Sequence, residues 1–345
     1  MQQLRVIQRF VGIGMTALLM AACQRTPNRP SASSPTNSQT VEHVRGETEV
    51  CGQPENIVVL GSSMLESLLA LDSQPVAYAD YLASMKGEYD NPSQQIPYLG
   101  DRITGQLVNL GLVDQPEIET IVQVQPDLIL GTEYNASQYE TFSQIAPTLL
   151  LTWTDSKANL ATIAQVLGKS EYAEALLAEW DQQITAARSN FAPVVASHPK
   201  VLILRSDNLQ EIYFGNQLFG TCASLVRELG FELASLPGFD ESNSEAPTIV
   251  SVETLSQFND ADLILMLGTG FDQADQIKGT DDFEDYQLSP LKQAWADSVI
   301  AQSLDASKAG KVYFIPYVSC AGLPGPIGTE LYLEELKEQL LSNKP

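Results

Sequence analysis

Short, continuous runs of apolar residues alternate with stretches of helical periodicity along most of the chain. Apolar runs of this length predict strands that are buried on both faces of a sheet, and the amphipathic stretches between them predict the helices that cover it. Together they indicate an α/β fold with mostly parallel sheets. The predicted strands are 56–61, 75–79, 127–131, 148–151, 200–205, 263–267 and 311–315.

The longest periodic stretch predicts one helix over residues 171–190, about 30 Å long at 1.5 Å per residue. A shorter helix precedes it, with Asp155 or Ser156 as its cap and Gly168 closing it. Because an α/β pattern lies on each side, we interpret the long helix as a rod that crosses from one lobe to another. An ordinary crossover helix within one domain is the alternative. The apolar residues at helical spacing are Ala173, Leu176, Leu177, Trp180, Ile184, Ala187 and Phe191.

The two halves of the chain share a sequence phrase. Residues 119–123, ETIVQ, lead into the apolar run 126–130, and residues 253–257, ETLSQ, lead into the run 261–265. The strands and helices around each phrase follow the same order, which is the pattern of an internal repeat. We therefore predict two related, Rossmann-like lobes with mostly parallel sheets, joined by a single long helix. The predicted boundaries are 41–152 for the N-terminal lobe, 153–191 for the linking helical segment and 192–345 for the C-terminal lobe.

The first 23 residues have the pattern of a secretion signal. Arg5 and Arg9 precede a short apolar run that ends at Cys23, and this run is too short for a good membrane span. The tripeptide AAC at its end resembles a bacterial lipobox, in which Cys23 becomes the lipidated first residue; a plain signal peptide cut nearby is the alternative. Residues 24–40 are rich in Pro, Ser, Thr, Asn and Gln, and they predict a disordered tether.

Charge restricts the partners. Residues 1–23 carry two arginines and no acid, so their removal takes the formal net charge from −24 to −26. Such a surface argues against nucleic acid, which needs a basic patch, and against electrostatic docking on anionic lipid. Only two histidines are present, His43 and His198, and they have no ligand spacing, so we expect no direct binding of a bare transition metal.

Three cysteines follow Cys23, and in an oxidising compartment this number suggests one pair and one unpaired thiol. Cys222 and Cys320 both come after the long helix, so we favour them as the disulfide. A surface redox function for these two residues is an alternative, but they form no short CxxC pair. Enzyme signatures such as GxSxG, GxGxxG, a phosphate loop and HExxH are absent from the sequence.

Ligands of α/β sheets bind beyond the carboxyl ends of the strands, so the loops after strands nominate the lining of a cleft between the lobes. Arg102 and Arg205 lie on such loops, and guanidinium groups bind carboxylate or hydroxamate oxygens bidentately. Each arginine could instead pair with a local aspartate, Asp101 or Asp207. Ser62 and Tyr81 also fall on these loops. The full set of predicted ligand-binding residues is Arg102, Arg205, Trp153, Tyr134, Tyr213, Tyr317 and Met64.

Several motifs together carry a family likeness. They are NIVVLGSSMLESLLAL at 56–71, EIETIVQVQPDLIL at 117–130, IAP at 145–147, the long helix and KVYFIP at 311–316. With the signal and lipobox, they resemble the class III solute-binding lipoproteins of ABC importers, and most of all the ferric-siderophore branch that binds iron-citrate and hydroxamate complexes. Cobalamin or haem receptors of the same fold are the nearest alternative, and an α/β enzyme that uses the same cleft is a more remote one.

The resemblance implies a monomeric, lipid-anchored receptor in the periplasm or on the outer face of the cytoplasmic membrane. It would bind an iron(III)-siderophore between its lobes and deliver it to an ABC permease and its ATPase. The iron would arrive inside the chelate, so no cofactor, catalytic residue or protein metal ligand is expected. In that family an acidic residue on each lobe docks to arginines of the permease, and the matching positions are Glu119 and Glu253.

Overall fold

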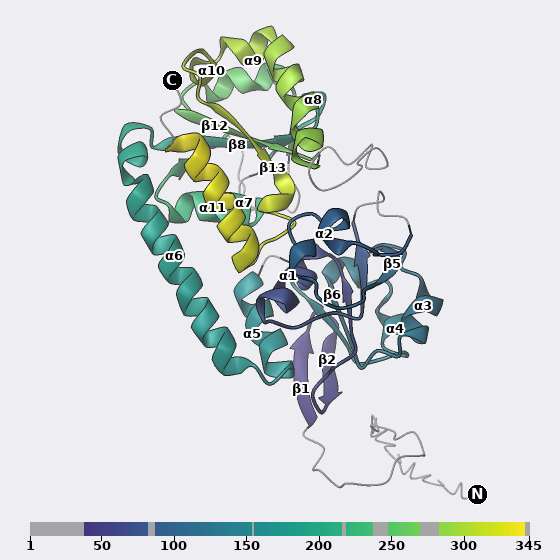
Figure 1. Cartoon of the computed structure of the whole chain (residues 1–345). Coiled ribbons are helices and arrows are strands. Elements are labelled where there is room, and N and C mark those ends of the chain that lie inside the picture. The colour runs from purple at the N-terminus through teal and green to yellow at the C-terminus, as the bar shows by residue number, and fades with distance from the viewer. Residues whose placement is uncertain are drawn as a thin grey trace, which may run out of the picture.

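The chain is described by a computed structural model that covers residues 38–81, 87–153, 155–215, 219–236, 248–269 and 283–341. Two α/β lobes lie at the two ends of one long helix (Figure 1). The prediction of two lobes joined by a single long helix is confirmed. The signal, the lipobox with Cys23 and most of the tether lie outside the described residues. Within these ranges, no helix combines the length and apolarity needed to cross a membrane.

The N-terminal lobe contains a five-stranded, wholly parallel sheet in the order β5-β4-β3-β6-β7. The continuous apolar runs predict β3, β4, β6 and β7 but not β5, which is only partly buried. A two-stranded hairpin precedes it and starts at Ser38, so the ordered lobe begins three residues inside the predicted tether of residues 24–40. The strands are β1 (Ser38–His43), β2 (Gly46–Cys51), β3 (Ile57–Leu60), β4 (Ala77–Asp80), β5 (Val108–Leu112), β6 (Leu128–Thr132) and β7 (Thr148–Leu151). The helices are α1 (Ser62–Ala70), α2 (Pro92–Gln95), η1 (Gly100–Arg102), α3 (Ile118–Gln123), η2 (Glu133–Asn135) and α4 (Tyr139–Phe142), where η marks a 3-10 helix.

Helix α5 (Ser156–Val166) begins where predicted, because the Asp155 carboxylate accepts a hydrogen bond from the Ala158 amide and so caps it. Gly168 adopts a positive φ of 66° in the tight turn that follows. The long helix α6 (Ser170–Ser197) then runs for 28 residues, or about 42 Å. It extends past the predicted end at residue 190 and continues through Pro193.

Helix α6 packs against both lobes, as a rod between them must. Near its start, Ala173 belongs to the core of the N-terminal lobe. Further along, Trp180 and Phe191 belong to the core of the C-terminal lobe, and Leu177 contacts both cores. The alternative of a crossover helix within one domain is therefore wrong.

The C-terminal lobe has a mixed sheet in the order β11-β9-β8-β12-β13, with β10 also paired to β8. Its central strands β8, β12 and β13 pair in parallel, whereas β9 pairs antiparallel with both β8 and β11. The strands are β8 (Lys200–Ser206), β9 (Ile212–Phe214), β10 (Glu232–Leu233), β11 (Thr248–Val250), β12 (Leu263–Gly268) and β13 (Val312–Pro316). The helices are α7 (Thr221–Glu228), η5 (Val252–Phe258), α8 (Phe283–Asp297), α9 (Val299–Ser303), α10 (Asp305–Lys308), η7 (Tyr317–Ser319) and α11 (Pro326–Leu340).

The repeated phrase does not fold identically in the two lobes. In the N-terminal lobe it forms the α-helix α3, whereas in the C-terminal lobe it forms the 3-10 helix η5. Cys222 and Cys320 form a disulfide, as predicted. None of the described cysteines is free, so the predicted unpaired thiol is not found among them.

Candidate ligand-binding site

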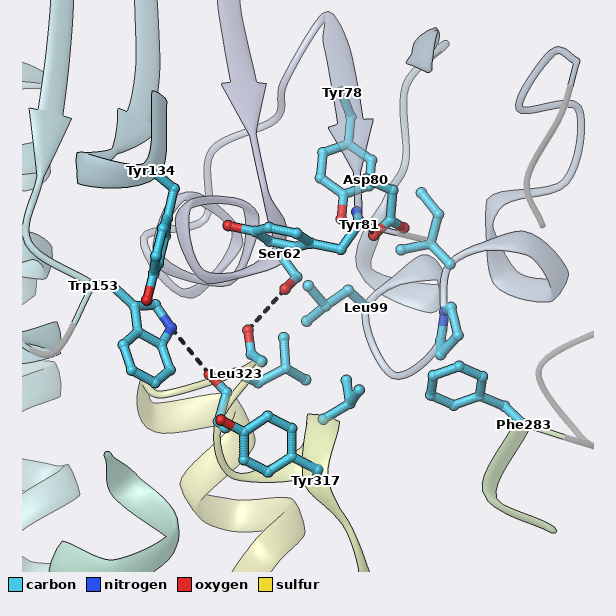
Figure 2. A pocket seen from close by; sticks show the side chains of 15 residues that line it. Ser62, Tyr78, Asp80, Tyr81, Leu99, Tyr134, Trp153, Phe283, Tyr317 and Leu323 are labelled. Atoms are coloured by element: carbon cyan, nitrogen blue, oxygen red, sulfur yellow. Dashed lines mark hydrogen bonds between the residues drawn. The ribbon is translucent and has the colours of Figure 1, made fainter. Parts of the chain in front are cut away.

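A cavity of about 380 Å³ lies between the two lobes. Figure 2 shows its walls, in which aromatic and aliphatic side chains predominate. Its position agrees with the rule that ligands of open α/β sheets bind beyond the carboxyl ends of the strands. The lining residues are Ser62, Tyr78, Asp80, Tyr81, Ile96, Pro97, Leu99, Tyr134, Trp153, Phe283, Tyr317, Val318, Ala321, Gly322 and Leu323.

The N-terminal lobe supplies its side of the cavity from the ends of neighbouring strands. Asp80 ends β4 and Tyr81 follows it, while Ser62 begins α1 just after β3. Tyr134 lies on η2, directly after β6. Because β4, β3 and β6 are parallel neighbours, these side chains reach the same edge of the sheet.

Trp153 closes one side of the cavity and links the two lobes. Its ring meets that of Tyr134 edge to face, with the centroids 6.4 Å apart. Its backbone amide donates to the Glu133 carboxylate at 2.7 Å, and its indole Nε1–H donates to the Ala321 carbonyl of the C-terminal lobe at 3.2 Å (Figure 2). These bonds fix the indole, so a rigid aromatic face is presented to the cavity.

The C-terminal lobe contributes Tyr317 and the segment after it. Tyr317 begins η7 immediately beyond β13, again at a strand end. Arg205, at the end of β8, stacks behind it: the guanidinium carbon lies 5.2 Å from the Tyr317 ring centroid and 4.2 Å from that of Tyr213. Arg205 Nε is buried and makes no hydrogen bond with the part of the chain that the structure describes. A positive charge therefore stands beside the cavity, separated from it by one aromatic ring.

The tyrosine hydroxyls of the site are neutral donors at physiological pH. Burial raises the pKa of Tyr81 to about 12, and it raises the pKa of Tyr78 well above its ordinary value. For Tyr317, burial also raises the pKa, and the adjacent Arg205 partly offsets that effect. Protonated phenols can donate hydrogen bonds to the oxygen atoms of a ligand.

The structure brings some of the predicted residues together and leaves others apart. Trp153, Tyr134 and Tyr317 line the cavity, together with Ser62 and Tyr81. Tyr213 and Arg205 do not line it, although Arg205 stacks on a residue that does. The Tyr213 hydroxyl instead donates to the Glu211 carboxylate at 2.8 Å.

Met64 and Arg102 are not among the lining residues. Met64 is only 1% exposed and packs in the core of the N-terminal lobe. At 100° per residue, the side chain of Met64, two positions after Ser62, points to the other side of α1. Met64 therefore faces the core and not the cavity, although it lies close to the end of β3 in the sequence. Arg102 is exposed on η1, where its carbonyl accepts a hydrogen bond from the Gln74 side chain.

Glu119 and Glu253 are both exposed, on α3 and η5 respectively. Each lies on the helix that directly precedes a parallel strand of its lobe, β6 after α3 and β12 after η5, which is the order that the repeated phrase predicts. A hydrogen bond with Ser251 lowers the pKa of Glu253, so that this carboxylate is ionised at neutral pH.

Sequence reasoning missed part of the lining. Asp80 could have been found, because it is the first polar residue after a predicted buried strand. Leu99 and Phe283 carried no such signal: Leu99 precedes a 3-10 turn and Phe283 begins α8, away from any strand end. Within the described ranges, no group of three or more His, Cys, Asp or Glu side chains is arranged to hold a metal ion.

Comparison with known proteins identifies the family. A family model described as "Periplasmic binding protein" matches residues 57–318, which include both sheets and most of the cavity lining. The chain belongs to the periplasmic binding protein family. The resemblance that the sequence motifs indicated is therefore confirmed.

Several relatives of this family member are found in Bacillus subtilis. The putative ABC transporter substrate-binding lipoprotein YhfQ is 26% identical over 341 residues, which is 96% of each chain. The probable siderophore-binding lipoprotein YfiY is 23% identical, again over 96% of each chain. The Fe(3+)-citrate-binding protein YfmC is 25% identical over 87% of this chain and 85% of its own.

Solved structures share the fold of this periplasmic binding protein. Staphylococcus aureus SirA, crystallised with staphyloferrin B, matches 89% of this chain and 100% of its own with a TM-score of 0.70 and 21% identity. Bacillus subtilis FeuA, crystallised with ferri-bacillibactin, matches 89% of this chain and 99% of its own with a TM-score of 0.66 and 23% identity.

Proposed function

We propose that the chain is the extracytoplasmic substrate-binding component of an ABC importer and that it binds an iron(III)-siderophore in the cavity between its lobes. The observation that carries this proposal is the cavity itself, which both lobes build from strand ends and which is walled by aromatic rings. Relatives named for ferric citrate and for siderophores support the same class of ligand.

The chemistry of the walls suits an organic chelate. Trp153, Tyr134 and Tyr317 offer aromatic faces to the organic shell of the ligand, and protonated phenols offer donors to its oxygens. Arg205 supplies positive charge beside Tyr317, which favours a ligand with negative charge. The iron would arrive already wrapped, so the protein would need neither a cofactor nor a catalytic group of its own, and the proposal assigns no enzymatic activity.

Delivery requires a docking surface for the permease. We assign that role to Glu119 and Glu253, because one exposed carboxylate on each lobe can meet a basic patch on each half of a two-sided permease. The lipidated Cys23 would hold the receptor at the outer face of the membrane, and the tether would let a monomer reach its permease and ATPase partner.

Tryptophan fluorescence provides a direct test, because Trp153 lines the cavity while Trp295 is buried in the C-terminal lobe. We expect the mature protein to show saturable quenching with ferric citrate or a ferric hydroxamate. Trp295→Phe is the matched control and should leave the ligand-dependent change intact. Quenching by cobalamin or haem alone, with no response to ferric chelates, would reject the iron assignment.

A further inference from the structure

A second connection joins the lobes besides α6. The segment 320–328, with the sequence CAGLPGPIG, belongs to the C-terminal half of the chain, yet Leu323 and Ile327 pack in the core of the N-terminal lobe. The chain then returns, because Tyr332 and Leu336 pack in the core of the C-terminal lobe. In Figure 1 the yellow helix α11 accordingly reaches α1, and the two helices are in contact. We call residues 321–328 the strap.

The strap is also part of the cavity wall. Its residues Ala321, Gly322 and Leu323 line the site. Two of them are held by the N-terminal half of the chain: the Ser62 hydroxyl donates to the Gly322 carbonyl at 2.8 Å, and the Trp153 indole donates to the Ala321 carbonyl (Figure 2). On the other side, the Thr221 hydroxyl donates to the Pro324 carbonyl at 3.2 Å.

Glu66 holds the strap most firmly. It lies one helical turn after Ser62 on α1 and is fully buried. Its two carboxylate oxygens accept hydrogen bonds from the amides of Gly325 and Gly328, each at 2.7 Å. Gly325 is the N-cap residue of α11 and Gly328 is in its first turn, where backbone N–H groups have no partner inside the helix and where the helix dipole favours negative charge.

The local sequence is fitted to this contact. A Cβ at Gly325 would stand 2.9 Å from the Glu66 carboxyl carbon, so only glycine allows the carboxylate to approach. Pro326 occupies the first position of α11, where the missing N–H costs nothing. A buried carboxylate is costly unless it is hydrogen-bonded, so this pairing must be maintained in the folded protein.

We infer that Glu66 is a positioning residue that clamps the strap of one lobe to helix α1 of the other and thereby fixes both the angle between the lobes and the cavity wall. The effect on the angle is independent of any ligand. The effect on ligand affinity rests on the proposed function.

The test compares Glu66→Gln and Gly325→Ala with the wild type without ligand. Glu66→Gln removes one of the two acceptors, and Gly325→Ala displaces an intact carboxylate. We expect hydrogen exchange of the peptide covering 321–328 to rise roughly tenfold or more in both variants, with exchange in α6 and β12 unchanged. Spin labels at Ser143→Cys and Ser303→Cys, exposed positions on the two lobes, should report a broadened or shifted inter-lobe distance.

Ser67→Ala is the matched control, because Ser67 is the next residue on α1 and its hydroxyl donates to Ser63 within the same helix. Unchanged exchange and unchanged distance in both Glu66→Gln and Gly325→Ala overturn the inference, as does an equal effect of Ser67→Ala. If a variant fails to fold, Ser62→Ala, which removes only the bond to Gly322, provides the milder test of the same clamp.

A second arm measures affinity for ferric citrate and for a ferric tris-hydroxamate by fluorescence. A probe that binds the wild type should bind Glu66→Gln more weakly, because the wall at 321–323 is less well fixed. If neither probe binds the wild type, the proposed ligand is wrong while the inter-lobe result stands.

Discussion

Arg205 influences the cavity through an aromatic ring. Its guanidinium stacks between Tyr213 and Tyr317, and only Tyr317 lines the site. Stacking of this kind can hold a cation in place without an acidic partner. Among the residues that the structure describes, no carboxylate forms an ion pair with Arg205. The sequence predicted an arginine at this strand end; it did not reveal that the charge would stand behind a tyrosine.

Arg205→Ala should weaken binding of an anionic ferric chelate about tenfold or more, because one positive charge beside a poorly solvated cavity is lost. The affinity of Arg205→Lys should lie between those of Arg205→Ala and the wild type, since lysine keeps the charge but lacks the flat guanidinium that stacks on the rings. Isothermal titration calorimetry at low and high salt measures the affinity of each variant. Arg188→Ala, an exposed arginine on α6, is the control. Equal affinity of Arg205→Ala and the wild type would contradict the electrostatic role.

Glu66 should make the stability depend on pH. Burial raises its pKa from 4.5 to about 7, although the strap amides oppose this effect. The folded state therefore binds the proton of the Glu66 carboxyl group more tightly than the unfolded state does. Protonation of Glu66 consequently stabilises the fold, and this contribution is fully present below pH 4.5 and is lost as the pH rises through 7. The free energy of unfolding changes by about 1.4 kcal/mol for each unit by which the pKa of Glu66 differs between the folded and unfolded states.

Urea unfolding of the wild type and Glu66→Gln between pH 4.5 and 8.5 measures this effect. The free energy of unfolding of the wild type should decline relative to that of the variant as the pH rises. Parallel curves would show that Glu66 does not titrate in this range.

The hydrophobic pattern predicted most of the helices and strands of the fold. Continuous apolar runs found most of the parallel strands, because strands buried on both faces must be apolar throughout. They missed the parallel strands β5 and β10, which are only partly buried. The pattern failed where tertiary contacts decide: the equivalent phrases gave α3 in one lobe and the 3-10 helix η5 in the other. It also gave no indication that the strap would cross between lobes, because that depends on glycines that permit close approach and not on periodicity.

Helix α6 continues past its predicted end at residue 190, and Pro193 lies inside it. Proline removes a helical hydrogen bond and crowds the preceding turn, yet here it lies exposed inside the helix. The packing of Phe191 in the core of the C-terminal lobe outweighs the cost of the lost hydrogen bond, and the exposure of Pro193 leaves the unpaired carbonyl open to water.

Pro193→Ala should therefore raise the melting temperature, with a gain in stability of about 1–3 kcal/mol. Pro326→Ala is the matched control, because Pro326 is at the first position of α11 and loses no hydrogen bond; it should be neutral or slightly destabilising. Thermal unfolding followed by circular dichroism distinguishes the two. A destabilised Pro193→Ala would contradict this explanation.

Two features resist a large change of angle between the lobes. Helix α6 packs on both cores, and the strap is buried in one lobe while its disulfide-bonded neighbour Cys320 is fixed to Cys222 in the other. We therefore expect closure by only a few degrees on ligand binding. Small-angle scattering with and without ferric chelate measures it, and a closure of tens of degrees would contradict the rigid arrangement.

Transport should depend on both exposed glutamates. Glu119→Lys with Glu253→Lys should abolish uptake of the ferric chelate in cells and leave its affinity for the purified protein unchanged, because both residues lie outside the cavity. Glu117→Lys, an exposed acid beside Glu119, is the control for general charge effects. Normal uptake by the double variant would remove the docking assignment.

One ferric chelate should bind between the lobes against the aromatic wall. This is measured by titrating the wild type and the double variant Trp153→Ala with Tyr317→Ala, both as mature protein, with a radioactive-iron chelate. We expect one iron per wild-type chain and a large loss of affinity in the folded double variant. Undiminished binding by that variant, or no binding of any ferric chelate by the wild type, would contradict it.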